Sequence, residues 1–169
     1  HFINKALQVL PKSVSLRLAL ARGFQQKGEV EKAIATTDQI LTAYPNSLDA
    51  LLLKSELLKS ENKNEEALRT LEKAYSYAPF DPQLAYNLAF EYAEAKNNKA
   101  LSLTDSLLGF PAAQEQAEPY YIKGVYYHNV GNITQAMQWY DRAIQQDYNF
   151  LDAHMDKGRL LFDQKRYEA

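Results

Sequence analysis

The sequence predicts an all-helical protein made of stacked antiparallel helix pairs, and three observations lead to this fold class. First, Pro11, Pro45 and Pro79 follow one another at a spacing of 34 residues, a period typical of helical repeat proteins. Second, a small residue in each period is followed three places later by a bulky one, so that both share a helix face. Third, no stretch alternates polar and apolar residues for long enough to indicate a strand.

The repeat register can be followed along the whole chain. The small position is held by Ala21, Ser55, Ala89, Gly124 and Gly158, and the bulky position by Phe24, Leu58, Tyr92, Tyr127 and Leu161. A second small position is held by Ala33, Ala67 and Ala136, while Ala100 falls one residue early. This register predicts a single array whose units span 1–13, 14–47, 48–81, 82–116, 117–150 and 151–169. We expect the first unit to be the second half of a repeat. The last should hold a first helix and the start of a second, as in a fragment of a longer chain.

Capping residues set the expected helix boundaries. Ser13, Ser47 and Asp81 stand where an N-cap is needed, and Asp81 precedes a proline, which suits the first helical position. Gly28, Asn62 and Gly131 stand where each first helix should end in a left-handed residue. The predicted helices are 1–10, 14–27, 30–43, 48–61, 64–77, 82–95, 98–108, 118–130, 133–146 and 151–164.

The unit 117–150 shows most clearly why the helices must stack. Gly124, Ala136 and Ala143 are placed where its two helices have to approach closely. One such hairpin cannot bury its own apolar face and requires neighbours of the same kind. The unit 82–116 is irregular, because its inter-helix turn is one residue short and its exit, 109–118, is long. We interpret that exit as a tolerated surface insertion in preference to a hinge.

Composition limits the possible functions. The chain is 46% hydrophobic and 24% charged, as in folded proteins, and its net charge of -2 with a pI near 6.0 argues against a nucleic-acid binder. Without cysteine it can form neither a disulfide nor a thiolate metal site. No apolar run approaches the length of a membrane span. Richness in Gln, Asn and Tyr suggests a bacterial protein of the cytoplasm, periplasm or cell envelope, although the compartment stays open.

The register resembles that of the tetratricopeptide repeat family across the whole chain. The segment 124–143 matches best, with Gly124, Tyr127, Gly131, Ala136, Tyr140 and Ala143 all in place. Thr37, Thr104, Ile40, Leu107 and Tyr148 depart from the family pattern. The resemblance implies a right-handed superhelix whose first helices line a concave groove. It also implies a non-catalytic scaffold that binds a peptide or helix of a partner protein, with no cofactor.

The family geometry then implies which residues line the groove. The candidates are Arg22, Glu56, Tyr86, Asn87, Phe90, Glu94, Tyr121, Val125, His128, Met155 and Arg159. Over all the lining positions, seven acidic residues face three basic ones, and apolar bulk gathers towards the C-terminal half. We therefore expect a protein or peptide partner with apolar anchors and some Lys or Arg. The alternative is that these side chains pack against neighbouring first helices or against a further repeat. A clamp for a partner's terminal carboxylate is not expected, because only Asn87 fits that pattern.

Candidate catalytic and metal-binding groups are sparse. No phosphate-binding loop or nucleophile elbow occurs, and the three histidines have no metal-ligand spacing. We expect His154 to be packed, Asp152 and Asp156 to form an acidic solvated face, and Trp139 to be core bulk. Asn132-Ile133-Thr134 matches a glycosylation sequon but also suits the inter-helix turn.

A structural role is the alternative function. The array could act as a spacer or a self-association module. Independently of that role, we expect the incomplete C-terminal repeat to expose apolar residues such as Leu160 and Leu161, so that a dimer of this chain alone would be an artefact of the exposed end.

Overall fold

A computed structural model describes residues 9–10 and 13–164 of the chain. They divide between Pro79 and Phe80 into two compact units, unit 1 before this boundary and unit 2 after it. Most of the helix predicted at 1–10 lies outside the described residues, as does the start of a second helix after residue 164.

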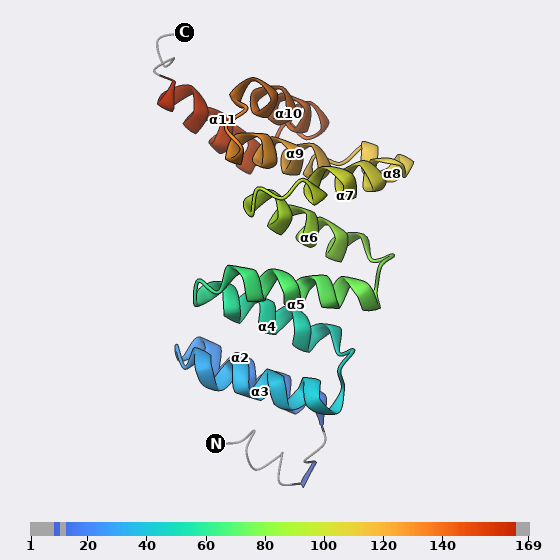
Figure 1. Ribbon diagram of the computed structural model, residues 1–169, viewed down its shortest axis with the longest axis vertical. Coiled ribbons are helices and arrows are strands. Elements are labelled where there is room, and N and C mark those ends of the chain that lie inside the picture. Colours follow the sequence, from blue (N-terminus) through green and yellow to red (C-terminus); the bar gives the residue numbers. More distant parts are fainter. Residues whose placement is uncertain (1–8, 11–12, 165–169) are drawn as a thin grey trace. The chain divides into compact units, whose positions relative to one another are not determined.

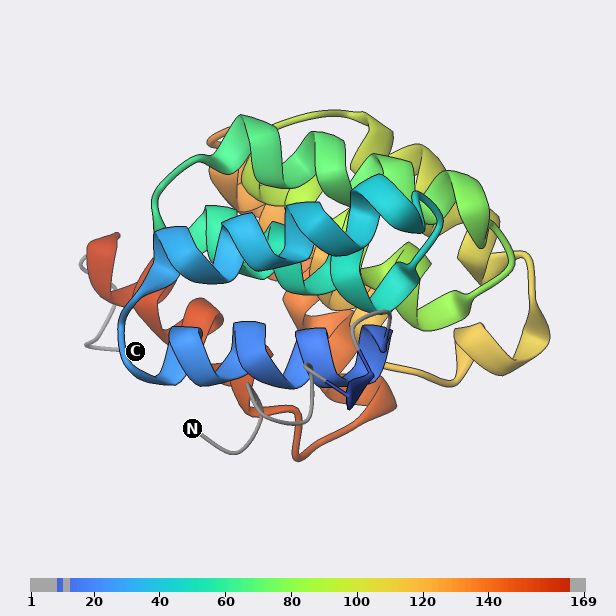
Figure 2. The same ribbon diagram turned by 90° about the horizontal axis from the view of Figure 1, so that it is seen from below.

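Unit 1 contains two antiparallel helix pairs (Figure 1). The first pair is α2 (Val14–Gln26) and α3 (Val30–Ala43), and the second is α4 (Leu48–Ser60) and α5 (Asn64–Tyr77). Figure 2 shows α2 and α3 lying side by side, and α3 also packs on α4. The core between the pairs is formed by small and leucine side chains, namely Ala21, Ala33, Leu53 and Leu57, with Leu18, Phe24, Val30 and Ile34 packed around them.

Unit 2 continues the same arrangement. It contains α6 (Pro82–Glu94) with α7 (Lys99–Leu108), then α9 (Glu118–Asn129) with α10 (Ile133–Gln146), and finally α11 (Leu151–Asp163) (Figure 1). Both α6 and α7 pack on α9, and α10 packs on α11. Each helix thereby buries the apolar stripe that an isolated hairpin would leave in water.

The long exit after α7 folds into a helix that the sequence analysis did not predict. This helix, α8 (Pro111–Gln114), buries Ala113 and lies against α7. Gln114 Nε2 donates a hydrogen bond to the carbonyl oxygen of Leu108, the last residue of α7, at 2.9 Å. The insertion therefore satisfies a carbonyl that the end of a helix leaves unpaired.

The capping predictions hold at most positions. Ser13 and Asp81 accept hydrogen bonds from backbone N–H groups three residues on, at 3.3 and 3.0 Å. Ser47 is the N-cap of α4, but its side chain makes no capping hydrogen bond, contrary to expectation. Gly28, Asn62 and Gly131 have φ values of 74°, 60° and 80°, which confirms the left-handed stops.

The irregular repeat ends its first helix in a different way. Lys96 stands where the other units have Gly or Asn, and its φ is 56°. The left-handed region is unfavourable for a side chain of this kind. The hairpin geometry therefore imposes the conformation on a residue that does not prefer it.

The nine helices predicted between residues 14 and 164 are all present, with ends that differ from the predictions by at most one residue. No strand occurs in the parts of the chain that the structure describes. Among those same residues, no helix has the length and apolar character that crossing a bilayer requires.

Candidate partner-binding surface

The first helices of unit 2 are linked by a row of side chains that begins at Phe90 on α6. The ring of Phe90 stacks on that of Tyr121 on α9, with centroids 6.3 Å apart and an interplanar angle of 18°. Both rings are partly exposed. Stacked, partly exposed aromatic rings offer apolar area at little cost in side-chain entropy.

Tyr121 is held at the centre of this row from two further sides. Its hydroxyl donates a hydrogen bond to Asp156 Oδ2 on α11 at 2.9 Å, and its ring lies 5.2 Å from that of Phe150. Burial raises the pKa of Tyr121 well above its usual value, and the hydrogen bond to Asp156 and the charge of that carboxylate raise it further. The neutral phenol therefore joins α9 to α11. The side chain of Asp156 is only 17% exposed, so the expectation that it lies on an acidic solvated face is wrong.

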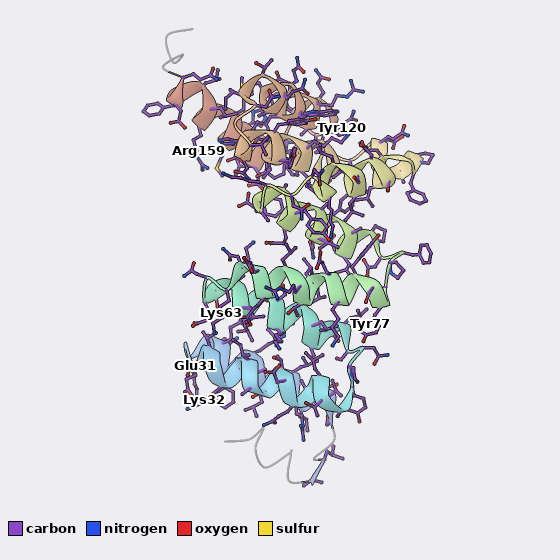
Figure 3. All side chains as sticks on the ribbon, in the orientation of Figure 1. Glu31, Lys32, Lys63, Tyr77, Tyr120 and Arg159 are labelled. Atoms are coloured by element: carbon purple, nitrogen blue, oxygen red, sulfur yellow. The ribbon has the colours of Figure 1, made fainter. Side chains whose placement is uncertain are left out.

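The row ends on α11 with charged and apolar groups that face solvent. Arg159 Nη1 lies 3.4 Å from Asp156 Oδ1, and its side chain is well exposed (Figure 3). Met155, one residue before Asp156, is 51% exposed. We call Phe90, Tyr121, Met155, Asp156 and Arg159 the first-helix surface of unit 2. It combines two stacked rings, a flexible thioether and an ion pair.

Polar contacts join α6 and α9 near their C-terminal ends. Asn129 Nδ2 donates to Glu94 Oε1 and to the carbonyl oxygen of Ala93, both at 3.2 Å. His128 Nδ1 lies 3.2 Å from the hydroxyl of Tyr140. Glu94 keeps an exposed carboxylate, whereas His128 is partly buried and engaged within its own hairpin.

Tyr86 and Asn87, near the start of α6, also make contacts within the chain. The Tyr86 hydroxyl donates a hydrogen bond to Gln116 Oε1 at 2.7 Å, so the loop after α8 reaches this helix. Burial raises the pKa of Tyr86, and the charge of Glu118 adds to the effect. Asn87 is exposed, and its Oδ1 accepts a hydrogen bond from Gln83 Nε2 at 3.2 Å.

Two further candidates, Arg22 and Glu56, belong to unit 1, on α2 and α4. Both are exposed. Glu56 Oε1 accepts a hydrogen bond from Gln25 Nε2 on α2 at 2.7 Å. The first helices of unit 1 are therefore joined by a polar contact where those of unit 2 are joined by aromatic rings.

Several residues that family geometry assigns to the groove are core residues. Val125 is only 4% exposed and presents almost no area to a partner. Ile122, Leu53 and Ala93 hold groove positions in the same register and are also buried. These side chains fill the space between neighbouring helices, which was the alternative interpretation of the apolar positions. Val125 is therefore left out of the first-helix surface.

Two other expectations are wrong. Leu160 was expected to be exposed at the end of the array, but it is 2% exposed, and Phe162 carries the exposed apolar area of that helix. His154 was expected to be packed, yet it is exposed, and its Nε2 donates a hydrogen bond to the carbonyl oxygen of Tyr148 at 2.8 Å. The exposure of both side chains depends on which face of α11 packs against α10.

Sequence reasoning missed a buried charge in unit 2. Lys123 on α9 is 7% exposed, forms an ion pair with Asp105 on α7, and places its Nζ 4.5 Å from the centroid of the Trp139 ring. Trp139 was expected to be core bulk, but it is only partly buried and lines a pocket. A lysine within an otherwise apolar helix face was the available signal, because such a group needs both a carboxylate and apolar cover. Within the described residues no cluster of His, Asp and Glu could hold a metal ion.

Comparison with known proteins agrees with this architecture. Two tetratricopeptide repeat family models match residues 18–82 and 117–150, together more than half of the chain. The mouse protein O-mannosyl-transferase TMTC1 is 27% identical over 139 residues, which are 80% of this chain but 15% of the relative. The human TMTC1 is 26% identical over 84% of this chain and 16% of its own length. The chain thus spans about one sixth of the curated relatives it matches.

Solved structures show the same fold. A tetratricopeptide repeat protein from Parabacteroides merdae superposes with a TM-score of 0.83 at 14% identity, over 97% of this chain and 65% of that one. YrrB, described as a TPR protein with an unusual peptide-binding site, gives 0.69 at 19% identity, over 99% and 86%. MamA from Desulfovibrio magneticus gives 0.70 at 17% identity, over 91% and 86%. These findings agree with the helix pairs and the repeat register: the chain belongs to the tetratricopeptide repeat family, and its fold is that of an α–α solenoid that serves as a protein-interaction scaffold.

Proposed function

We propose that the chain binds a peptide or helix of a partner protein on its first helices, and that it does so without catalysis. The observation that carries this proposal is the stack of Phe90 on Tyr121, which continues through Asp156 to Arg159. It gives unit 2 a preformed anchor surface, because each ring is held by a neighbouring helix before a partner arrives. The residues that contribute most of the binding energy of an interface are often aromatic side chains that are held in place before the partner binds.

Charge supports a partner with basic residues. The first helices of unit 2 carry five acidic side chains at the positions assigned to the groove, namely Glu94, Glu118, Asp152, Asp156 and Asp163. Arg159 is the basic side chain at those positions in unit 2, and it is already paired with Asp156. A segment with apolar residues and one or more Lys or Arg therefore complements this surface in both charge and shape.

The similarity to TMTC1 raises the question of transferase activity. The matched part is 15% of that protein's length, and the similarity by itself assigns no catalytic group to this chain. We propose a binding role for this chain, in which any chemistry of a longer protein would be carried elsewhere.

Site-specific photo-crosslinking tests the proposal. A photoreactive amino acid replaces Met155, and the matched control carries it at Glu65, which is also exposed but lies on α5, a second helix. We expect protein adducts at position 155 that Phe90→Ala and Asp152→Arg reduce, because they remove a ring and reverse an exposed acidic charge, and few at position 65. Equal adducts at both positions, or adducts at 155 that neither substitution affects, would contradict the proposal.

A self-association role has one observation in its favour. Leu151 and Phe162 on α11 are each 65% exposed, which is a large apolar area for one helix. Light scattering of the wild-type chain and of Phe162→Ser tests this role. A dimer that the substitution abolishes would support it, and a wild-type monomer over the whole concentration range would exclude it.

A further inference from the structure

Unit 2 contains a pocket that none of its first-helix contacts uses. It is open to solvent, has a volume of about 350 Å³, and is lined by Leu108 of α7, Tyr120 of α9, and Gln138, Trp139 and Arg142 of α10. Most of this lining belongs to second helices, so the pocket is separate from the first-helix surface. Its volume lies at the small end of the range for ligand sites, which suits one or two side chains of a partner.

Two aromatic rings form walls of the pocket, and contacts within unit 2 hold both of them in place. Tyr120 and Trp139 stack with centroids 6.3 Å apart and an interplanar angle of 18° (Tyr120 is labelled in Figure 3). The Trp139 ring is also in contact with Lys123, whose ammonium group is paired with Asp105. Because these contacts lie within the unit, the rings are positioned whether or not the pocket is occupied.

The insertion after α7 fixes the opposite rim. The Tyr120 hydroxyl donates a hydrogen bond to the carbonyl oxygen of Gln114 at 3.1 Å, and Gln114 Nε2 donates to the carbonyl oxygen of Leu108. The helix α8 thus ties two lining residues together. Since α7 has 10 residues where α10 has 14, the chain leaves α7 early, and the insertion contacts the pocket lining through its hydrogen bonds with Leu108 and Tyr120.

Arg142 supplies the chemical selectivity. Its guanidinium carbon lies 5.7 Å from the centroid of the Tyr120 ring, and its side chain is exposed. Among the described residues no carboxylate is paired with it, in contrast to the ion-paired Lys123, Lys157 and Arg159. A guanidinium stacked on a ring keeps its N–H donors in a planar fork that fits a carboxylate.

The corresponding positions of an earlier repeat hold neither the two aromatic rings nor the arginine. Two units before, the positions of Tyr120, Trp139 and Arg142 hold Leu51, Thr70 and Lys73. The family register alone therefore does not require the two rings or the arginine. The combination is particular to unit 117–150.

We propose that this pocket is a second binding site, which takes an aromatic side chain adjacent to a carboxylate in an acidic–aromatic peptide segment. The partner's ring would lie between Tyr120 and Leu108 and against Trp139, and its carboxylate would pair with Arg142. This ligand is opposite in charge to the basic segment proposed for the first-helix surface. The two sites can therefore be told apart by the peptides they select.

Trp139 is the only tryptophan in the chain, so its fluorescence reports directly on the pocket. The probe is acetyl-Gly-Asp-Phe-Gly-amide, and the matched control peptide has Asn in place of Asp. We expect the Asp peptide to shift the emission with saturation below about 1 mM, and the Asn peptide to bind about tenfold more weakly, because it loses a charge-assisted pair.

Three variants complete the test. Arg142→Gln should weaken the Asp peptide about tenfold and remove its preference over the Asn peptide. Leu108→Phe should weaken both peptides by filling the pocket, with circular dichroism to show that the helices persist. Arg159→Gln, a change on the first-helix surface, should leave the titration unchanged. Unaltered Trp139 emission with the Asp peptide, or equal binding by wild type and Arg142→Gln, would overturn the proposal.

Discussion

Gly124 on α9 faces the ring of Tyr140 on α10 so closely that a Cβ atom at Gly124 would lie 2.5 Å from Tyr140 Cε1. Tyr140 is fully buried, and its ring therefore has no free space into which it could move. The small residue that the repeat register requires at this position is the one that allows the two helices to meet.

We predict that Gly124→Ala destabilises the protein by about 1–3 kcal/mol, because the new methyl group has to displace a buried ring. Gly158 is the matched control, since it occupies the same register position on α11 but a Cβ atom there would meet no heavy atom within 4 Å. There, alanine should stabilise the helix by up to about 1 kcal/mol through its higher helix propensity. Urea denaturation followed by circular dichroism measures both changes. A Gly124→Ala variant as stable as the wild type would show that α9 and α10 can separate freely.

The buried ion pair predicts an asymmetric response. Asp105→Ala should destabilise unit 2 by about 1–3 kcal/mol, because it leaves the ammonium group of Lys123 buried without a carboxylate. Because Asp105 is well exposed, solvent screens the ion pair, and the loss of stability should be smaller than for a pair in which both groups are buried. Lys123→Met should cost less, since its apolar chain keeps the contact with Trp139. Thermal unfolding of both single variants and of the double variant measures the coupling.

An exposed ion pair serves as the control for that experiment. Glu65 and Arg69 on α5 lie one helical turn apart, and both side chains are largely exposed. Glu65→Ala should change the free energy of unfolding by less than about 0.5 kcal/mol. If Asp105→Ala and Glu65→Ala had equal effects, burial of Lys123 would have no energetic consequence.

Alkaline pH should destabilise unit 2 through Tyr121 and Tyr140, whose phenols are kept neutral in the folded state. The pKa values of Tyr121 and Tyr140 are raised, in each case mainly by burial, so the folded state favours the neutral phenols. Their contribution is complete below the unfolded pKa of about 10 and is lost as pH rises above it. Tyr121→Phe should lower the midpoint of thermal unfolding at pH 7, but it should flatten the decline between about pH 9 and 11. Parallel curves for the variant and the wild type would contradict this linkage.

The turn of the irregular repeat offers a stabilising change. Lys96 has a φ of 56°, a conformation that glycine adopts without steric cost. Lys96→Gly should therefore raise the free energy of unfolding by up to about 1 kcal/mol. Its neighbour Ala95 has a φ of -77°, and Ala95→Gly should have the opposite effect. Equilibrium denaturation in urea compares the two, and a loss of stability in Lys96→Gly would show that the side chain contributes more than the strain costs.

Local chemistry was sufficient to predict the helices and their stops. Gly28, Asn62 and Gly131 end helices because they tolerate positive φ, and Asp81 begins one because its carboxylate accepts a backbone N–H. These preferences act within a few residues, so they can be recognised in the sequence alone. The 34-residue spacing then implies that successive hairpins stack, since each has an apolar face to bury.

Which side chains reach solvent was decided by tertiary packing. Tyr121 and Val125 lie one turn apart on α9 and both occupy positions assigned to the groove, yet one remains partly exposed and the other is buried. The ion pair of Lys123, the short helix α8 and the pocket beside Arg142 likewise depend on how α7, α9 and α10 meet. The sequence alone determined where the nine helices predicted between residues 14 and 164 begin and end, to within one residue, because capping and φ preferences are local. Only the tertiary structure determined which faces touch, because that depends on distances between residues far apart in the chain.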